Sequence, residues 1–274
     1  MASTTQTNAA EGPVAGLTSR WASAAADTPA IWKILSLALI FGAWEIAGRT
    51  NFNYAFPGFL ETMAALWEMI ADGSMGAAYL RTAEPLVLGL VISLAIGVSS
   101  GVAMGLRRDV EWLTLPIFIT MQAAPMAALI PLVTFVYGIG LASKVLAVVM
   151  LSLPVIAINS YKAVRNVPSS LVDMSRSFMG SRRQQVFGII LPAASPMMFA
   201  GIRLGVAEGF SGAVLAELLI TPTGIGDLIT YNRSIAKFAH MYAAIFSIVA
   251  LAVITVSLLH RLEVTLFRPE KRGV

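Results

Sequence analysis

The sequence predicts an all-α, polytopic membrane protein with about six transmembrane helices. Of its 274 residues, 57% are hydrophobic and only 12% are charged, and the mean hydropathy is +0.77. A soluble domain averages about 45–50% apolar and about 25% charged residues. A single globular core cannot bury such an excess of apolar residues, so a lipid bilayer must act as the solvent for most of the chain.

The composition also excludes several kinds of site. The chain has no cysteine, which excludes disulfides and thiolate metal sites. Its net charge of +4 does not point to nucleic acid, because basic residues of membrane proteins usually mark cytoplasmic loops. No G-x-x-x-x-G-K-[ST] loop is present, so we expect the chain itself to bind neither ATP nor magnesium. His240 and His260 are isolated near span ends, and we expect no metal site and no catalytic residue.

Apolar runs of the length of a span divide the chain. We expect one transmembrane domain over residues 30–267, between cytoplasmic tails over residues 1–29 and 268–274. An amphipathic segment at residues 59–70 suits an interfacial helix. The six expected spans cover residues 31–47, 85–106, 113–137, 144–158, 197–220 and 242–259.

The third of these regions contains Pro116, Pro125 and Pro131. Proline breaks the helical hydrogen-bond ladder, and at membrane depth only protein or water can satisfy the carbonyls that it frees. We therefore expect a broken region that faces the interior of the helix bundle.

The distribution of basic residues predicts the orientation. With a cytoplasmic N-terminus, thirteen Lys and Arg residues fall on the inner side and five on the outer side, which places both termini in the cytoplasm. The inner residues are Arg20, Lys33, Arg107, Arg108, Lys162, Arg165, Arg176, Arg182, Arg183, Arg261, Arg268, Lys271 and Arg272. The outer residues are Arg49, Arg81, Lys144, Arg233 and Lys237.

Two spans carry small residues at every fourth position. This spacing keeps the small residues on one helical stripe and lets neighbouring backbones approach closely, within one subunit or between subunits. The second span has Gly89, Ser93, Gly97, Gly101 and Gly105, and the fifth has Gly201, Gly205, Gly209 and Ala213.

The long basic segment between spans four and five, residues 161–192, predicts a helix–turn–helix pair. Pro168 suits a helix start, and Leu171, Met174 and Phe178 recur at i, i+3 and i+7 on one face. We expect Gly180 to provide the backbone freedom that reverses the chain before a second, basic helix.

This segment resembles the cytoplasmic coupling loop of bacterial ABC-importer permeases, whose pattern is E-A-A, three residues, Gly, nine residues, I-x-L-P. Asp173, Met174 and Ser175 fill the E-A-A places, and Ile189 fills the isoleucine place. Met179 falls on the glycine place, with Gly180 one residue later.

Two further stretches are similar to those of nitrate, taurine and aliphatic-sulfonate permeases. One resembles their P-x-x-A-L-x-P-L…G-x-G stretch, and the other their A-E-L-L…G-L-G-x-L-I stretch. The matching residues are Pro125, Ala128, Leu129, Pro131, Leu132 and 138–140 in the first, and 216–219, 224–226, Leu228 and Ile229 in the second.

The resemblance implies the membrane subunit of a type I importer in a bacterial cytoplasmic membrane. Its implied partners are a second copy of this chain, two cytoplasmic ATPase subunits that carry the ATP and magnesium, and an external substrate-binding protein. The implied solute is a small organic or inorganic oxyanion such as a sulfonate, taurine or nitrate. The implied ATPase-coupling residues are Leu171, Asp173, Met174, Ser175, Phe178, Gly180, Arg182, Arg183 and Gln184.

Candidate pathway or gate residues carry polar or soft side chains within the spans. Ionisable residues there are costly and often functional. Arg203 can also snorkel or pair with a carboxylate, Glu208 can pair with a neighbouring helix, and methionine is more often plain packing. The candidates are Met121, Gln122, Pro125, Pro131, Arg203, Glu208 and Glu217.

Two other function classes remain open alternatives at this point. A stand-alone secondary transporter would favour internal repeats and ion-coordinating broken helices, but no repeat relates the two halves of this chain. A membrane-embedded enzyme would need a nucleophile–base pair or a His–acid pair near an interface.

Overall fold

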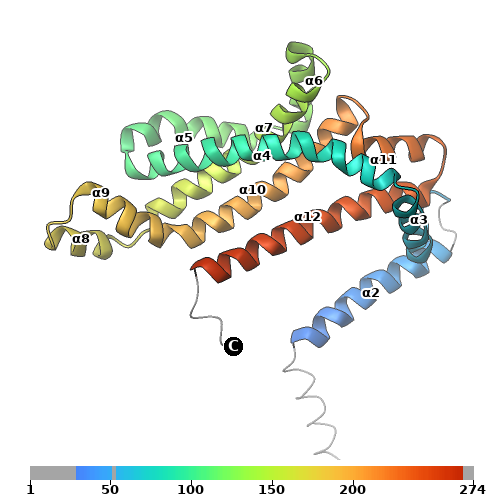
Figure 1. Ribbon diagram of the computed structural model, residues 1–274, viewed down its shortest axis with the longest axis horizontal. Helices are drawn as coiled ribbons and strands as arrows, with labels where there is room; N and C mark the ends of the chain where they lie inside the picture. The colour runs from blue at the N-terminus through green and yellow to red at the C-terminus, as the bar shows by residue number, and fades with distance from the viewer. Residues whose placement is uncertain (1–28, 51–53, 268–274) are drawn as a thin grey trace, which may run out of the picture. The chain divides into compact units, whose positions relative to one another are not determined.

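The computed structural model describes residues 29–50 and 54–267, and within them every regular element is helical (Figure 1). The chain divides into two compact units, residues 1–61 and 62–274. Five described helices are long and apolar enough to span a bilayer, or six if one sharply bent pair counts as a span. The expected number of spans is therefore confirmed. The two predicted tails lie almost entirely outside the described residues and stay predictions.

In the first unit, α2 (Pro29–Arg49) has 21 residues and is about 31 Å long, enough to cross the hydrocarbon core. A polar cluster fixes the chain after it. Glu45 pairs with Arg49 at 2.6 Å and accepts the backbone N–H of Leu60 at 2.9 Å. Trp44 Nε1 donates to the carbonyl of Pro57 at 3.0 Å. These bonds hold the start of the next helix against the end of α2.

The helix α3 (Phe59–Ala71) matches the expected amphipathic segment and buries Thr62, Ala65 and Met69. A tight turn then leads into α4 (Ser74–Leu106). Gly73 adopts the left-handed conformation, with φ +78°, and Asp72 Oδ1 accepts the N–H of Ser74 at 2.8 Å. The hydrogen bonds from Ser74 hold the pKa of the Asp72 carboxyl below its usual range.

The helix that contains the second expected span, α4, starts eleven residues before Pro85, so Pro85 lies inside it. The Asp72–Gly73 turn sets the start. With 33 residues, α4 is about 50 Å long, so its first turns extend beyond a hydrocarbon core of about 30 Å.

The proline-rich third region is broken, as expected. Helices α5 (Arg108–Ala123) and α6 (Met126–Tyr137) meet at an angle of 103°. Ala124 is extended, and Pro125 precedes the first turn of α6, where the N–H of Ala128 bonds to its carbonyl at 2.8 Å. Pro116 and Pro131 lie inside α5 and α6.

The helix α7 (Leu141–Arg165) is the centre of the second unit, and α4 and α10 (Leu191–Leu219) pack on it. The predicted stripes of small residues form these contacts. A Cβ on Gly101 would lie 2.5 Å from the carbonyl oxygen of Ala157, and one on Gly205 would lie 3.3 Å from the carbonyl oxygen of Ser152. The helices therefore touch backbone to backbone within one subunit.

The last two helices are α11 (Gly224–Ser234) and α12 (Phe238–Phe267). Helix α11, which buries Ile225, Ile229 and Asn232, was not predicted from the sequence. Helix α12 extends beyond the expected sixth span, residues 242–259, at both ends. Figure 1 shows α12 running beside α10.

We expect Gly101→Ala to lower the free energy of unfolding by about 1–3 kcal/mol, because the added methyl forces α4 away from the α7 backbone. Gly76 of the same helix meets nothing within 4 Å, so Gly76→Ala should be neutral or stabilising by up to about 1 kcal/mol. Unfolding of both variants in detergent micelles measures the difference. Equal stability of the two variants would contradict close packing at Gly101.

Candidate functional site

The predicted helix–turn–helix pair is present, although it is shorter than the expected 161–192 segment. Helix α8 (Ser169–Ser177) is followed by α9 (Arg182–Gln185) and a π-helical turn, η1 (Val186–Ile190), which runs directly into α10. Figure 1 shows α8 and α9 at one end of α10 and α11 at the other. The excursion from the bundle therefore covers residues 166–181 only, because α7 and the helical run into α10 extend further than expected.

The second helix of the pair starts with a capping box. Gln184 Oε1 accepts the N–H of Ser181 at 2.8 Å, and Ser181 Oγ accepts the N–H of Gln184 at 3.4 Å. Gln185 Nε2 also donates to the carbonyl of Gly180 at 2.8 Å. Reciprocal bonds of this kind satisfy backbone donors at the helix start and fix the direction of the entering chain.

The residue that reverses the chain is Met179, with φ +54°, so the expectation that Gly180 does so is wrong. Met179 fills the glycine place of the pattern, and a left-handed conformation there explains why glycine suits it. Glycine is needed at position 180 for a different reason, because a side chain there would have no room. The N–H of Gly180 donates to the Ser175 carbonyl at 2.9 Å, and a Cβ on it would lie 2.5 Å from Ser175 Oγ.

The outer face of this pair is apolar and exposed. Leu171 is 36% exposed, Met174 is 50% exposed and Phe178 is 81% exposed. Ser175 is buried against the turn, and Asp173 forms an exposed pair with Arg176 at 3.2 Å. The basic residues Arg182 and Arg183 are exposed on the next helix, α9.

A second feature is a cavity of about 410 Å³ at the break between α5 and α6. Three of the predicted pathway residues, Met121, Gln122 and Glu208, line it together. Met126 and Met150 add two thioethers, and Pro154 of α7 adds an apolar wall. The broken helix pair thus brings residues of α5, α6, α7 and α10 to one cavity.

Glu208 is the one ionisable residue among the described residues that line this cavity. It is about 26 Å along α10 from Leu191 and about 16 Å from Leu219, so it is far from both helix ends. Its side chain is exposed and makes no hydrogen bond or ion pair with any described residue. The other candidates, Pro125, Pro131, Arg203 and Glu217, are not among the lining residues.

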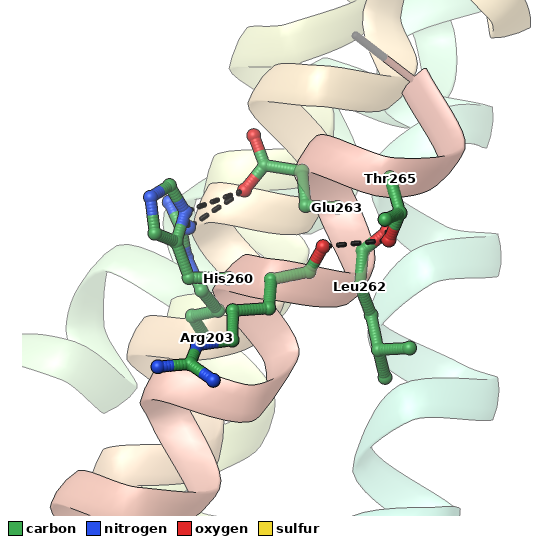
Figure 2. Close-up of polar contacts among 6 residues, drawn as sticks. Arg203, His260, Leu262, Glu263 and Thr265 are labelled. Atoms are coloured by element: carbon green, nitrogen blue, oxygen red, sulfur yellow. Dashed lines mark hydrogen bonds and ion pairs between the residues drawn. The ribbon is translucent and has the colours of Figure 1, made fainter. Parts of the chain in front are cut away.

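Arg203 pairs with a carboxylate, one of the two alternatives considered for it. Its Nη1 lies 2.6 Å from Oε2 of Glu263 on α12, and it also contacts His260 Nδ1 (Figure 2). His260 Nδ1 lies 3.5 Å from the same carboxylate. Glu263 is only 2% exposed. Glu263 was not a candidate because the expected sixth span ended at residue 259, although Leu262 and Val264 continue the apolar pattern.

Glu217 is fully buried, at 0% exposure, and it fixes the start of α11. Its Oε2 accepts the N–H of Gly226 at 2.9 Å, and Thr82 Oγ1 accepts the N–H of Ile225 at 3.0 Å. Lys144 bonds to Thr223 next to this cluster. The role of Glu217 as an outer gate residue stays a prediction. Because Glu217 is fully buried, it lies inside the protein and not on a surface that a partner could contact.

Comparison with known proteins identifies related chains. Residues 89–272 match the family described as "Binding-protein-dependent transport system inner membrane component". The riboflavin transport system permease protein RibX of Chloroflexus aurantiacus is 29% identical over 85% of this chain and 86% of its own. The taurine transport system permease protein TauC of Escherichia coli is 29% identical over 72% of this chain and 66% of its own.

Two more comparisons extend this result. The putative aliphatic sulfonates transport permease protein SsuC of Bacillus subtilis is 25% identical over 84% of each chain. Among solved structures, a chain of the inward-facing MetNI methionine ABC transporter superposes with a TM-score of 0.55 at 18% identity, over 70% of this chain and 95% of its own. This structural similarity shows a shared fold.

We expect Met179→Gly to leave the helix–turn–helix pair intact, because glycine adopts a positive φ without strain. Gly180→Val should open the pair, because its side chain would collide with Ser175. Trypsin cleavage after Arg182 and Arg183 in native membranes reports the opening. Faster cleavage of Met179→Gly than of Gly180→Val would contradict this account of the turn.

We expect Arg203→Ala to lower the free energy of unfolding by about 3–5 kcal/mol, because it leaves the buried Glu263 carboxylate without its cation. The double variant Arg203→Met, Glu263→Leu removes both charges and should recover most of the loss. Denaturant unfolding of the three proteins in micelles tests this. A double variant as unstable as Arg203→Ala would show that packing, rather than charge pairing, is the cause.

Proposed function

Because this chain belongs to the family of binding-protein-dependent transport system inner membrane components, and is the permease subunit of an ABC importer, we propose specific roles for the two features described above. The helix–turn–helix pair docks a cytoplasmic ATPase, and the cavity beside Glu208 is part of the solute pathway. Membership in this family implies ATPase and substrate-binding partners and dimerisation, and it replaces the alternatives of a secondary transporter and a membrane-embedded enzyme.

The exposed apolar face of α8 is the observation that carries the docking proposal. Large exposed apolar patches mark interaction sites. Phe178 is 81% exposed, so we expect a partner to cover it. The face suits helix-in-groove recognition, in which apolar residues enter a groove on the partner. Arg182 and Arg183 then lie at the rim, where they can meet acidic groups.

The finer assembly is a homodimer of this chain with two ATPase subunits and one external binding protein. ATP and magnesium are held by the ATPase subunits, because this sequence contains no phosphate-binding loop of its own. The assembly sits in a bacterial cytoplasmic membrane. The excess of basic residues on one side supports cytoplasmic termini and a cytoplasmic α8–α9 pair.

The pathway proposal is supported by the position of Glu208. An exposed carboxylate far from both ends of a spanning helix cannot face lipid without a large desolvation cost, so it faces water or protein. The solute is a small organic or inorganic oxyanion such as a sulfonate, taurine or nitrate. The relatives named for taurine and aliphatic sulfonates support that class.

We expect Phe178→Ala to abolish uptake and to release the ATPase, because losing a central aromatic anchor often costs an interface about 2 kcal/mol or more. Arg182→Ala, the matched rim variant, should do less and should make binding more sensitive to salt. Co-purification of the ATPase, together with uptake, measures both effects. Full uptake and a retained ATPase in Phe178→Ala would remove α8 as the docking element.

Because the chain has no native cysteine, the topology can be tested with single cysteines. Ser181→Cys, in the α8–α9 turn, and Pro222→Cys, exposed before α11, should be labelled from opposite sides of the membrane. An impermeant maleimide added to intact cells should react only with Pro222→Cys. Labelling of Ser181→Cys from outside would invert the proposed orientation.

A further inference from the structure

The cavity at the α5–α6 break is lined by one acidic residue and by no basic residue among those that the structure describes. Of the described residues that line it, Glu208 carries the only ionisable group, and no Lys, Arg or His is among them. The other polar group is the Gln122 amide, which offers two N–H donors and one acceptor. Three thioethers, from Met121, Met126 and Met150, supply soft and adaptable apolar contacts.

This charge distribution opposes the passage of a simple anion. The Glu208 carboxylate has no cationic partner among the described residues, so nothing offsets its field inside the cavity. Charges interact several-fold more strongly at the effective dielectric constant of a protein than in bulk water. A solute that carries only negative charge would be repelled by Glu208, whereas a cationic group would be attracted to it.

We propose that Glu208 binds the cationic group of the transported solute, so that the solute is a zwitterion that bears an amine or a quaternary ammonium. This inference rests on the proposed function, because it needs the cavity to be part of the pathway. Among the solute classes named above, it selects taurine-like molecules over nitrate and simple sulfonates. The Gln122 amide can donate to the oxyanion end of such a molecule, and the thioethers can contact its methylene groups.

A direct test measures the electrostatic potential in the cavity of the full-length chain in its membrane. Ala127 is exposed and lines the cavity, so Ala127→Cys gives a single reactive thiol with little change in volume. Its modification rate is compared for a cationic trimethylammonium-ethyl methanethiosulfonate and an anionic sulfonatoethyl methanethiosulfonate. We expect the cationic reagent to react faster by about tenfold or more, as field focusing in a charged cleft allows.

Matched variants isolate the carboxylate. Adding Glu208→Gln, which keeps the shape and removes the charge, should abolish the preference, while Glu208→Asp should keep it. Ser181→Cys serves as the control, because its rate ratio should not change when Glu208 is replaced. An unreactive Ala127→Cys, or a rate ratio that Glu208→Gln leaves unchanged, would overturn the proposal. The first result would mean that a second subunit or lipid covers the carboxylate.

Protection by solutes tests the chemical class. Taurine and isethionate share the sulfonate and differ in carrying an ammonium or a hydroxyl group. Taurine should slow the reaction of Ala127→Cys with neutral N-ethylmaleimide at least several-fold more than isethionate, and Glu208→Gln should remove the difference. Equal protection by the two solutes, or none by taurine, would overturn the assignment. Labelling needs neither the ATPase nor the binding protein, so this result is independent of the docking tested by Phe178→Ala.

Discussion

The close contact of three helix backbones is the constraint on which the rest of the second unit depends. Apolar side chains gain little by leaving lipid for protein, so membrane helices associate through tight packing and hydrogen bonds. Here α4 and α10 contact α7 at glycines, and Ser152 on α7 donates to Ser93 on α4 at 2.6 Å inside the same contact. Because α4 and α10 both pack closely on α7, these helix contacts remain where the break between α5 and α6 leaves a cavity beside α7.

The ionisable residues of this unit show which charges serve the fold. Glu217 bonds to the backbone of α11, and Glu263 pairs with Arg203, so each joins two elements. Both carboxylates are almost fully buried and satisfy the rule that buried charge must be paired or hydrogen-bonded. Glu208 is different, because it is exposed in a cavity and has no partner among the described residues. A charge that stabilises nothing in the fold and is costly within a membrane is the one to associate with the solute.

Much of the fold could be predicted from local patterns, and the exceptions have tertiary causes. Apolar runs located the spans, prolines located the α5–α6 break, and fourfold spacing located the helix contacts. Helix α11 was missed because its two glycines and few apolar residues resemble a loop, and bonds from Glu217 and Thr82 fix its first turn. Glu263 was missed because it follows the expected end of the sixth span and because its partner is 60 residues away in sequence, on α10. Residue type selected seven pathway candidates, but only the structure showed that Met121, Gln122 and Glu208 line one cavity. The exchange of roles between Met179 and Gly180 likewise required the backbone dihedral angles.

One continuous helical run leads from the end of the α8–α9 turn to Glu208, which offers a physical route between the two proposed sites. From Arg182 to Leu219 the chain has no non-helical residue, so α9, η1 and α10 form a rod of 38 residues that starts at the capping box. Glu208 and Arg203 both lie on this rod, and Arg203 pairs with Glu263 on α12. The π-helical turn η1 sits where Pro192 lacks the N–H that would extend an ordinary ladder, and such turns adjust a helix locally without ending it. If a partner docks on α8, displacement of α8 and α9 would turn or shift α10 at the level of the cavity. The ion pair between Arg203 and Glu263 on α12 would oppose that shift. Helix α10 would therefore both transmit the movement from the ATPase and stabilise the fold.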